Sequence, residues 1–139
     1  MTNKNQRVIK FRAWYRGGKV MGPIENWTGM TGDEKQEFRY VVVGFPVHKV
    51  LTTDRVEIME FTGLHDKKGI EIYEGDILNS LYSFEGCKGV YEVVWIDGRF
   101  HPRRRGVHQQ MGVTITMSDL SRCEVIGNIY DNPELCPKK

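Results

Sequence analysis

The residues that could do chemistry include two carboxylates that flank a glycine in Tyr73-Glu74-Gly75-Asp76-Ile77. Paired carboxylates can hold a hard cation or act as a general acid and base. The same residues also suit a turn that leads into a strand, because glycine permits the bend and Asp76 can accept backbone N–H groups. We favour the turn, since the chain has no His-x-x-x-His spacing to supply further ligands.

Histidine and cysteine residues complete the search for a catalytic or metal site. The four histidines stand far apart, at His48, His65, His101 and His108. The three cysteines are Cys87, Cys123 and Cys136. Their odd number and wide spacing argue against both a disulfide framework and a structural zinc site. No Gly-x-Ser-x-Gly motif frames a nucleophile. We therefore expect no catalytic residue, no metal and no cofactor.

Positive charge is concentrated between Arg99 and His108. The candidate nucleic-acid ligands in this segment are Arg99, His101, Arg103, Arg104 and Arg105. In an exposed loop they could clamp phosphates, while Phe100, Trp95 or Tyr91 stacks on bases. The alternative interpretation is a solvated loop that keeps the edge of a barrel from pairing with a neighbouring chain. The same charges would also suit an acidic partner.

Composition limits the protein class. The chain has 139 residues, of which 40% are hydrophobic and 27% are charged, as is typical of a soluble globular protein. No apolar run approaches the roughly 20 residues that span a bilayer, and the start, MTNKNQRVIK, lacks the apolar core of a signal peptide. We expect a cytoplasmic protein without a membrane anchor. The net charge of +2 gives no global attraction to nucleic acid.

The N-terminal part, residues 1–55, predicts a hairpin, a loop and a short helix. Residues 8–14 alternate in polarity, and Gly17-Gly18 offers a turn into Lys19-Val20-Met21. Residues 22–33 show no sustained period, which predicts a loop. Asp33 can cap a helix over residues 33–40, before the β-branched run at residues 41–43.

The remaining part, residues 56–139, predicts several short strands. Two alternating runs within residues 58–78 are bent together by Asp66-Lys67-Lys68-Gly69. Residues 90–96 form a strand by residue type, and Asp97-Gly98 returns the chain. Residues 111–117 alternate with a period of two, and residues 123–126 predict a last strand. This spacing indicates a small antiparallel barrel.

Three separated motifs carry a family resemblance. They are Ile9-Lys10-Phe11-Arg12-Ala13-Trp14, the residues from Phe61 to Ile77 that include Asp66 and Gly69, and Val125-Ile126-Gly127-Asn128-Ile129-Tyr130 with Asn132-Pro133-Glu134-Leu135. In order and spacing the chain resembles the YopX family of phage and prophage proteins. The resemblance implies a mostly β protein with an SH3-like barrel in its C-terminal part. It carries over no activity, cofactor or catalytic residue.

The sequence therefore predicts a mainly β protein with an N-terminal β-hairpin and a short helix, followed by a small antiparallel SH3-like barrel. We expect a phage-encoded accessory protein in the host cytoplasm, a non-catalytic module that binds a protein partner. The alternative is a nucleic-acid-binding protein that uses the basic segment. A homo-oligomer is compatible with both, and an enzyme is the least favoured class, because nothing assembles a nucleophile, a base and a stabilising group.

Overall fold

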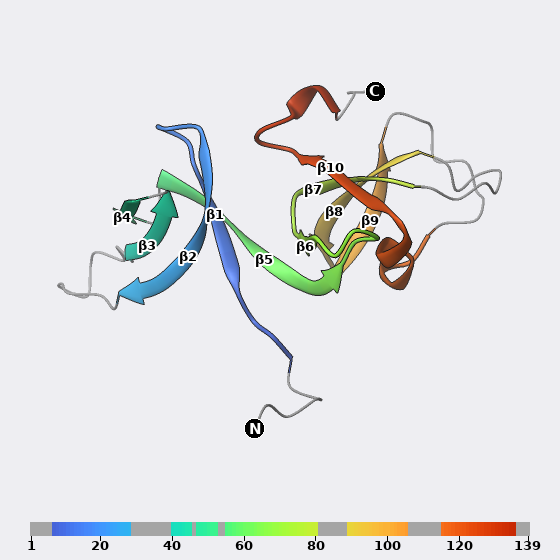
Figure 1. Cartoon of the computed structure of the whole chain (residues 1–139), viewed down its shortest axis with the longest axis horizontal. Helices are drawn as coiled ribbons and strands as arrows, with labels where there is room; N and C mark the ends of the chain where they lie inside the picture. Colours follow the sequence, from blue (N-terminus) through green and yellow to red (C-terminus); the bar gives the residue numbers. More distant parts are fainter. Residues whose placement is uncertain are drawn as a thin grey trace. The chain divides into compact units, whose positions relative to one another are not determined.

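A computed structural model of the chain describes residues 7–28, 40–45, 47–52, 55–80, 89–105 and 115–135. These residues form antiparallel β-strands with short 3-10 helices, which confirms the mainly β class (Figure 1). The chain divides into two compact units, one of Ile9–Glu60 and one that combines Met1–Val8 with Phe61–Lys139. The expected boundary between residues 55 and 56 falls at the start of strand β5, Val56–His65, whereas the division lies within that strand.

The first unit opens with the expected hairpin. Strand β1, Phe11–Tyr15, pairs antiparallel with strand β2, Val20–Thr28. The loop predicted from residue 22 is wrong over residues 22–28, because β2 continues through them. Pairing with two neighbours explains the difference, since β2 lies between β1 and strand β3, Tyr40–Phe45. Tertiary pairing here overrides a weak local preference.

Strand β3 pairs with strand β4, Val47–Thr52, and β1 pairs on its other side with the first half of β5. Residues 33–39 of the expected helix lie outside the described residues, and Tyr40 belongs to β3 rather than to a helix. Buried apolar side chains from several strands form a core for this unit, namely Ala13, Leu51 and Val56, with Tyr15, Ile24 and Ile58 packed against them.

The second unit begins where the second half of β5 pairs with strand β6, Glu71–Tyr73. The predicted bend at Asp66 to Gly69 is present, but the strand after it is interrupted at Glu74-Gly75. Strand β7, Asp76–Asn79, then joins a different sheet. The chain therefore changes sheets within the motif at residues 73–77, with Glu74 in the turn and Asp76 at the start of β7.

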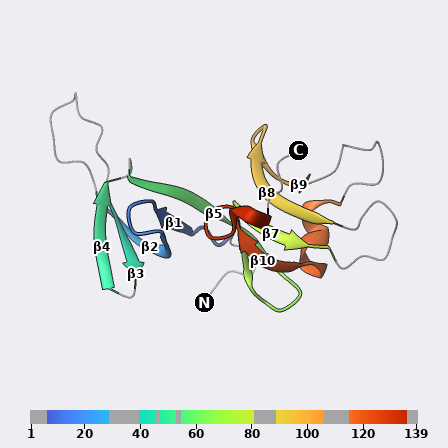
Figure 2. The same ribbon diagram turned by 90° about the horizontal axis from the view of Figure 1, so that it is seen from above.

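The second sheet has the strand order β10-β7-β8-β9 (Figure 2). Its other members are strand β8, Val90–Ile96, strand β9, Arg99–Arg105, and strand β10, Glu124–Asn128. All described pairings are antiparallel. The sheet is not closed, since β9 and β10 stand at its two ends, so a closed SH3-like barrel is not confirmed.

The strand expected over residues 111–117 is wrong at its C-terminal end, and residues 111–114 lie outside the described residues. Ile115 is buried but not in a strand, and Met117 begins a 3-10 helix, Met117–Arg122. The Thr116 N–H donates to Oδ2 of Asp119 at 2.8 Å. This local hydrogen bond stabilises the first turn of the helix, which the alternating pattern did not reveal.

The core of the second unit lies under this sheet and includes residues from the 3-10 helix. Its fully or nearly fully buried members are Ile72, Leu78, Tyr91, Val93, Ile115, Leu120 and Cys123. Leu64, Phe100, Met117 and Val125 pack against them. The strands therefore hold the β8 and β9 hairpin on a packed apolar base.

Candidate functional site

The hairpin of β8 and β9 is built on a two-residue turn. Asp97 and Gly98 have φ values of 54° and 76°, so both central residues adopt the left-handed conformation that a type I′ turn requires. Aspartate and glycine tolerate this conformation best. The register then pairs Ile96 with Arg99 and Trp95 with Phe100. The sequence predicted this turn correctly.

The basic segment is a strand and not a loop over residues 99–105, which corrects our interpretation of it. Every residue of β9 has a partner in β8. The turn fixes the register, and the β-branched and aromatic residues of β8 favour pairing, so the segment follows despite its arginines and proline. Residues 106–108 lie outside the described residues.

The five candidate ligands do not form one cluster. Side chains alternate between the faces of a strand, so Arg99, His101 and Arg103 share one face and Arg104 lies on the other. Arg104 is opposite Tyr91, and its Nε lies 3.1 Å from where a Cβ at Gly89 would be. Arg105 is opposite Val90, and its side chain is outside the described residues.

Three cross-strand pairs define a surface that we call the basic ladder. The pairs are Ile96 with Arg99, Val94 with His101, and Glu92 with Arg103. Paired residues lie on the same face of an antiparallel sheet. Exposure increases toward the turn, because Glu92 and Val94 are buried, His101 and Arg103 are half-buried, and Ile96 and Arg99 are exposed. The turn end of the ladder is therefore its accessible part.

Glu92 is a functional partner that the sequence reasoning missed. Its carboxylate is almost fully buried, and its Oε1 lies 3.5 Å from a terminal guanidinium nitrogen of Arg103. A buried carboxylate needs such a partner, since an isolated charge in an apolar environment is costly. The available signal was one acidic residue in the otherwise apolar strand YEVVWI. Arg103 is thus engaged within the sheet.

The aromatic residues considered for base stacking lie on the opposite face from the basic ladder. Tyr91 is buried in the core and Phe100 packs against it. The rings of Trp95 and Phe100 meet edge to face, with centroids 4.8 Å apart. Trp95 nevertheless keeps 49% of its surface exposed, whereas Trp14 is buried. The side chain of the third tryptophan, Trp27, lies outside the described residues.

Pro102 shapes the outer edge of β9. The C=O of Val93, the partner of Pro102, accepts a hydrogen bond from the Gly75 N–H at 2.8 Å, so this carbonyl points away from β9. In an antiparallel ladder the paired residue then points its own backbone groups outward. Pro102 is buried and places its missing N–H at the outer edge of β9, where no described strand pairs and where a proline interrupts pairing with another strand.

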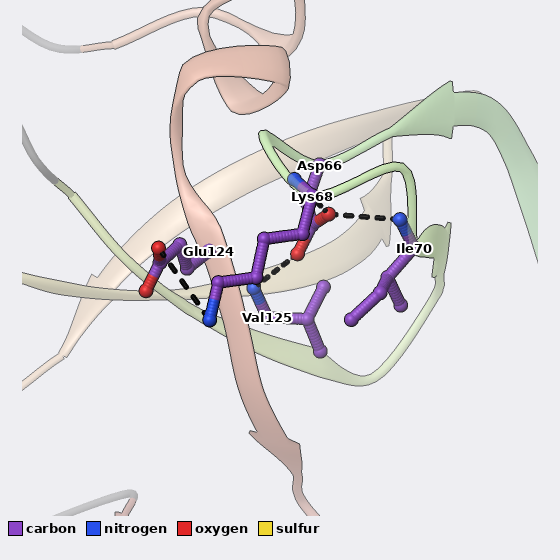
Figure 3. Close-up of polar contacts among 5 residues, drawn as sticks. All are labelled: Asp66, Lys68, Ile70, Glu124 and Val125. Carbon is purple, nitrogen blue, oxygen red and sulfur yellow. Dashed lines mark hydrogen bonds and ion pairs between the residues drawn. The ribbon is translucent and has the colours of Figure 1, made fainter.

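The turn at Asp66 covers the other edge of the same sheet (Figure 3). Oδ1 of Asp66 accepts the N–H groups of Lys68 and Ile70, both at 2.8 Å, and Oδ2 accepts the N–H of Val125 in β10 at 2.9 Å. The Lys67 N–H also donates to the Cys123 C=O at 2.9 Å. The turn thus occupies the outward backbone groups of residues 123 and 125.

The protonation of Asp66 follows from these contacts. Burial raises the pKa of its carboxyl group, whereas the hydrogen bonds from Val125, Ile70 and Lys68, with the charge of Lys68, lower it. The net result is a pKa below the usual value of 3.8. The carboxylate form therefore holds the turn against β10. Gly69, with a φ of 82°, completes the turn in a conformation that other residues rarely adopt.

Asp76 has the turn role that we favoured. Its Oδ2 accepts the Tyr73 N–H at 2.8 Å, and the side chain is buried. Within the described residues no group of three or more histidine, cysteine or acidic side chains is placed to hold a metal ion. Asp76 and its neighbour Glu74 thus stand at the point where the chain changes sheets.

The C-terminal motif forms a second side-chain turn. Oδ1 of Asn128 accepts the N–H groups of Tyr130 and Asp131, at 3.0 and 2.8 Å. Oδ1 of Asn132 accepts the Asn128 N–H at 3.3 Å. A Cβ at Gly127 would overlap this Asn132 oxygen. Glycine is therefore required here by space, and the motif holds the end of β10 to the residues that follow.

Of the remaining histidines and cysteines, the structure describes the side chains of His65 and Cys123. His65 is exposed and meets the Phe61 ring edge to face, with centroids 5.6 Å apart. Cys123 is buried, and its thiol donates to the Asp119 C=O at 3.5 Å. Three of the remaining residues, Cys87, Cys136 and His108, lie outside the described residues, as does the side chain of His48.

No helix among the described residues is long and apolar enough to cross a membrane.

Comparison with known proteins places these features in a family. The family model described as YopX protein matches residues 10–136. The chain is similar to the crystal structure of protein EF1440 from Enterococcus faecalis, with 30% identity and a TM-score of 0.62 over 95% of this chain and 100% of that chain. It is also similar to the structure of yopX from Bacillus subtilis, with 19% identity and a TM-score of 0.55 over 94% and 97%. No curated protein matches.

Proposed function

The chain belongs to the YopX family, and from this premise we propose that it is a non-catalytic module that binds a protein partner through the end of the β8 and β9 hairpin. The observation that carries the proposal is the exposure of two large apolar side chains directly before the turn. Trp95 is 49% exposed and Ile96 is 39% exposed. They lie on opposite faces, so both sides of the hairpin end present apolar surface.

A rigid support makes these side chains suitable for binding. The type I′ turn and the seven cross-strand pairs of β8 and β9 fix the backbone. Phe100 holds the Trp95 ring from one side and is itself packed on the core. Tryptophan is enriched among residues that dominate binding energy, and a preorganised contact surface loses less entropy on binding.

The use of the motif carboxylates supports a non-catalytic role. Asp66 and Asp76 accept backbone N–H groups within turns. Asn128, in the third motif, does the same. Groups engaged in this way stabilise the fold, whereas a catalytic group must reach a substrate. These residues, which belong to the motifs of the family resemblance, thus stabilise turns of the fold.

The biological setting that we propose comes from the family resemblance. The chain is a phage-encoded or prophage-encoded accessory protein that acts in the cytoplasm of the host bacterium. The partner is accordingly a protein that the host or the phage supplies in that compartment.

Nucleic-acid binding is the second candidate function, favoured by the three basic side chains that share one face of β9. Here Arg99, His101 and Arg103 would contact phosphates, with Arg104 and Arg105 in the same strand. Such binding weakens steeply with salt, because each neutralised phosphate releases counterions. A filter-binding titration of duplex and single-stranded DNA across salt concentrations tests it directly.

The test of the protein-binding proposal uses matched variants of the full chain. We expect Trp95→Ala to abolish nuclease-resistant capture of a host or phage protein from lysogenic or infected cells. The control is Ile126→Ala, which removes an exposed apolar side chain from β10 in the same unit. Both variants should keep the parent melting curve. Equal capture by the parent and both variants would show that the hairpin end is not the contact surface.

A further inference from the structure

The turn end of the basic ladder combines one apolar and two basic side chains. Ile96 and Arg99 are exposed and His101 is half-buried. Within the described part of the chain, the side chains of Arg99 and His101 have no hydrogen-bond or ion-pair partner, whereas Arg103 is paired with Glu92. The Arg99 charge and the His101 imidazole at the turn end are thus available to a partner, whereas the Arg103 charge deeper in the ladder is already paired.

The edges of the sheet restrict how a partner can bind. At β9 the backbone N–H that an added strand would need is missing at Pro102. At β10 the turn at Asp66 occupies the outward groups of Cys123 and Val125. Strand addition relies on a continuous row of free backbone groups. Binding through side chains is the mode that remains for this sheet.

We propose that the turn end of the basic ladder binds an acidic segment of a protein partner. Carboxylates of the segment contact Arg99 and His101, and an apolar residue of the segment packs on Ile96. The inference rests on the proposed function and adds the chemistry of the partner. Charge complementarity carries it, because unpaired basic groups beside an apolar contact match a segment that alternates acidic and apolar residues.

The geometry favours a protein segment over nucleic acid. Stacking of bases needs aromatic rings beside the basic groups. Here Trp95 and Phe100 lie on the opposite face, and the basic face carries Ile96 instead.

A selection of random displayed peptides against the full chain tests the inference. We expect the enriched peptides to be acidic with an apolar residue. Arg99→Glu should weaken the binding of a synthesised selected peptide about tenfold, since it replaces an attraction with a repulsion. The matched control is Arg122→Glu, which makes the same charge change at an exposed position of the same unit. It should leave the affinity unchanged.

The possible outcomes distinguish a failure of the acidic-segment inference from a failure of the proposed protein-binding function. Selected peptides that lose binding in Trp95→Ala but are not acidic, or that ignore Arg99→Glu, would overturn the inference and leave the hairpin as a binding surface. Peptides that bind equally well to Trp95→Ala and Arg99→Glu, or no enrichment at all, would contradict both. Tighter binding of duplex DNA than of acidic peptides, lost in Arg99→Glu, would replace the inference with the nucleic-acid alternative.

Discussion

The free energy of unfolding should depend on pH through the carboxyl group of Asp66. Its pKa is lower in the folded protein than its usual value of 3.8. Its stabilising contribution is therefore fully present above that value and is lost as the pH falls through the lower folded pKa. The turn against β10 should loosen in acid, where protonation removes an acceptor of backbone N–H groups.

We predict that Asp66→Asn lowers the free energy of unfolding by about 1–3 kcal/mol at neutral pH, because charge-assisted hydrogen bonds are lost. The loss should shrink below pH 3.8, where the parent carboxyl is itself becoming protonated. Urea unfolding at both pH values measures it. Lys68→Ala is the control and should change stability little, since its contact with Glu124 is long and exposed. A constant loss at all pH values would contradict the linkage.

Gly127 provides a second test at the residue scale. We predict that Gly127→Ala destabilises the fold by about 1–3 kcal/mol, because the new Cβ overlaps the Asn132 amide oxygen. Asn132→Ala removes that oxygen, so the double variant should be more stable than the sum of the two single losses implies. Thermal or urea unfolding of the four proteins completes the cycle. Strict additivity would show that the two residues do not compete for space.

The contacts of single residues differ in how far the sequence could predict them. The turn roles of Asp66 and Asp76 are local, since an aspartate accepts N–H groups a few residues away. The sequence predicted both. The contact of Asp66 with Val125 joins residues 59 positions apart, and the buried pair of Glu92 and Arg103 depends on strand register. Such long-range contacts can be recognised only once the arrangement of the strands is known.

At the scale of elements, β9 shows why the basic segment was misassigned. Arginine and proline within residues 99–105 carry weak strand preference, so the segment resembled a loop. The Asp97-Gly98 turn and the apolar residues of β8 decide its conformation instead. The reverse error occurred at residues 115–117, where an alternating pattern was overridden by the capped 3-10 helix. Strong turn signals were more reliable than alternation alone.

The strand assignment changes what arginine substitutions should do. We predict that Arg103→Ala lowers stability by about 1–3 kcal/mol, because it leaves the buried Glu92 carboxylate without this cation. Arg99→Ala should lower stability by less than about 0.5 kcal/mol, since Arg99 is exposed. Urea unfolding compares the two. Equal effects would indicate that Arg103 does not stabilise the sheet. The result also shows which of the two arginines can be replaced in binding studies without a loss of stability.

Pro102 should act as a block on self-association. We predict that Pro102→Val keeps or raises stability but causes concentration-dependent association, because an N–H returns to the outer edge of β9. Light scattering over a range of protein concentrations measures this. Pro133→Val is the control, since Pro133 lies in the 3-10 helix Pro133–Leu135, away from β9 in the sequence. Association of both variants, or of neither, would remove the edge-blocking role.

At the scale of the whole molecule, each of the two units has its own apolar core. One is formed around Ala13, Leu51 and Val56, and the other around Ile72, Leu78 and Val93. Strand β5 belongs to both units. The fold class and most strands could be predicted from local patterns, whereas the change of sheets at Glu74-Gly75 could not. That change depends on which distant strands compete for β6 and β7.

Burial of apolar side chains supplies the main driving force for both units. We therefore predict that neither a reductant nor a chelator alters the melting temperature of the whole protein. The odd number of cysteines and the wide spacing of the histidines are the basis of this prediction. Differential scanning calorimetry with each reagent measures the melting temperature. A large drop with the chelator would require a metal-dependent fold, and a drop with the reductant would require a disulfide between the other two cysteines.

The thiol of Cys123 gives a further test of the core of the second unit. Cys123 is buried as a thiol beside Asp119, so we predict that it resists alkylation until the protein unfolds. Thiol labelling before and after the addition of urea measures this.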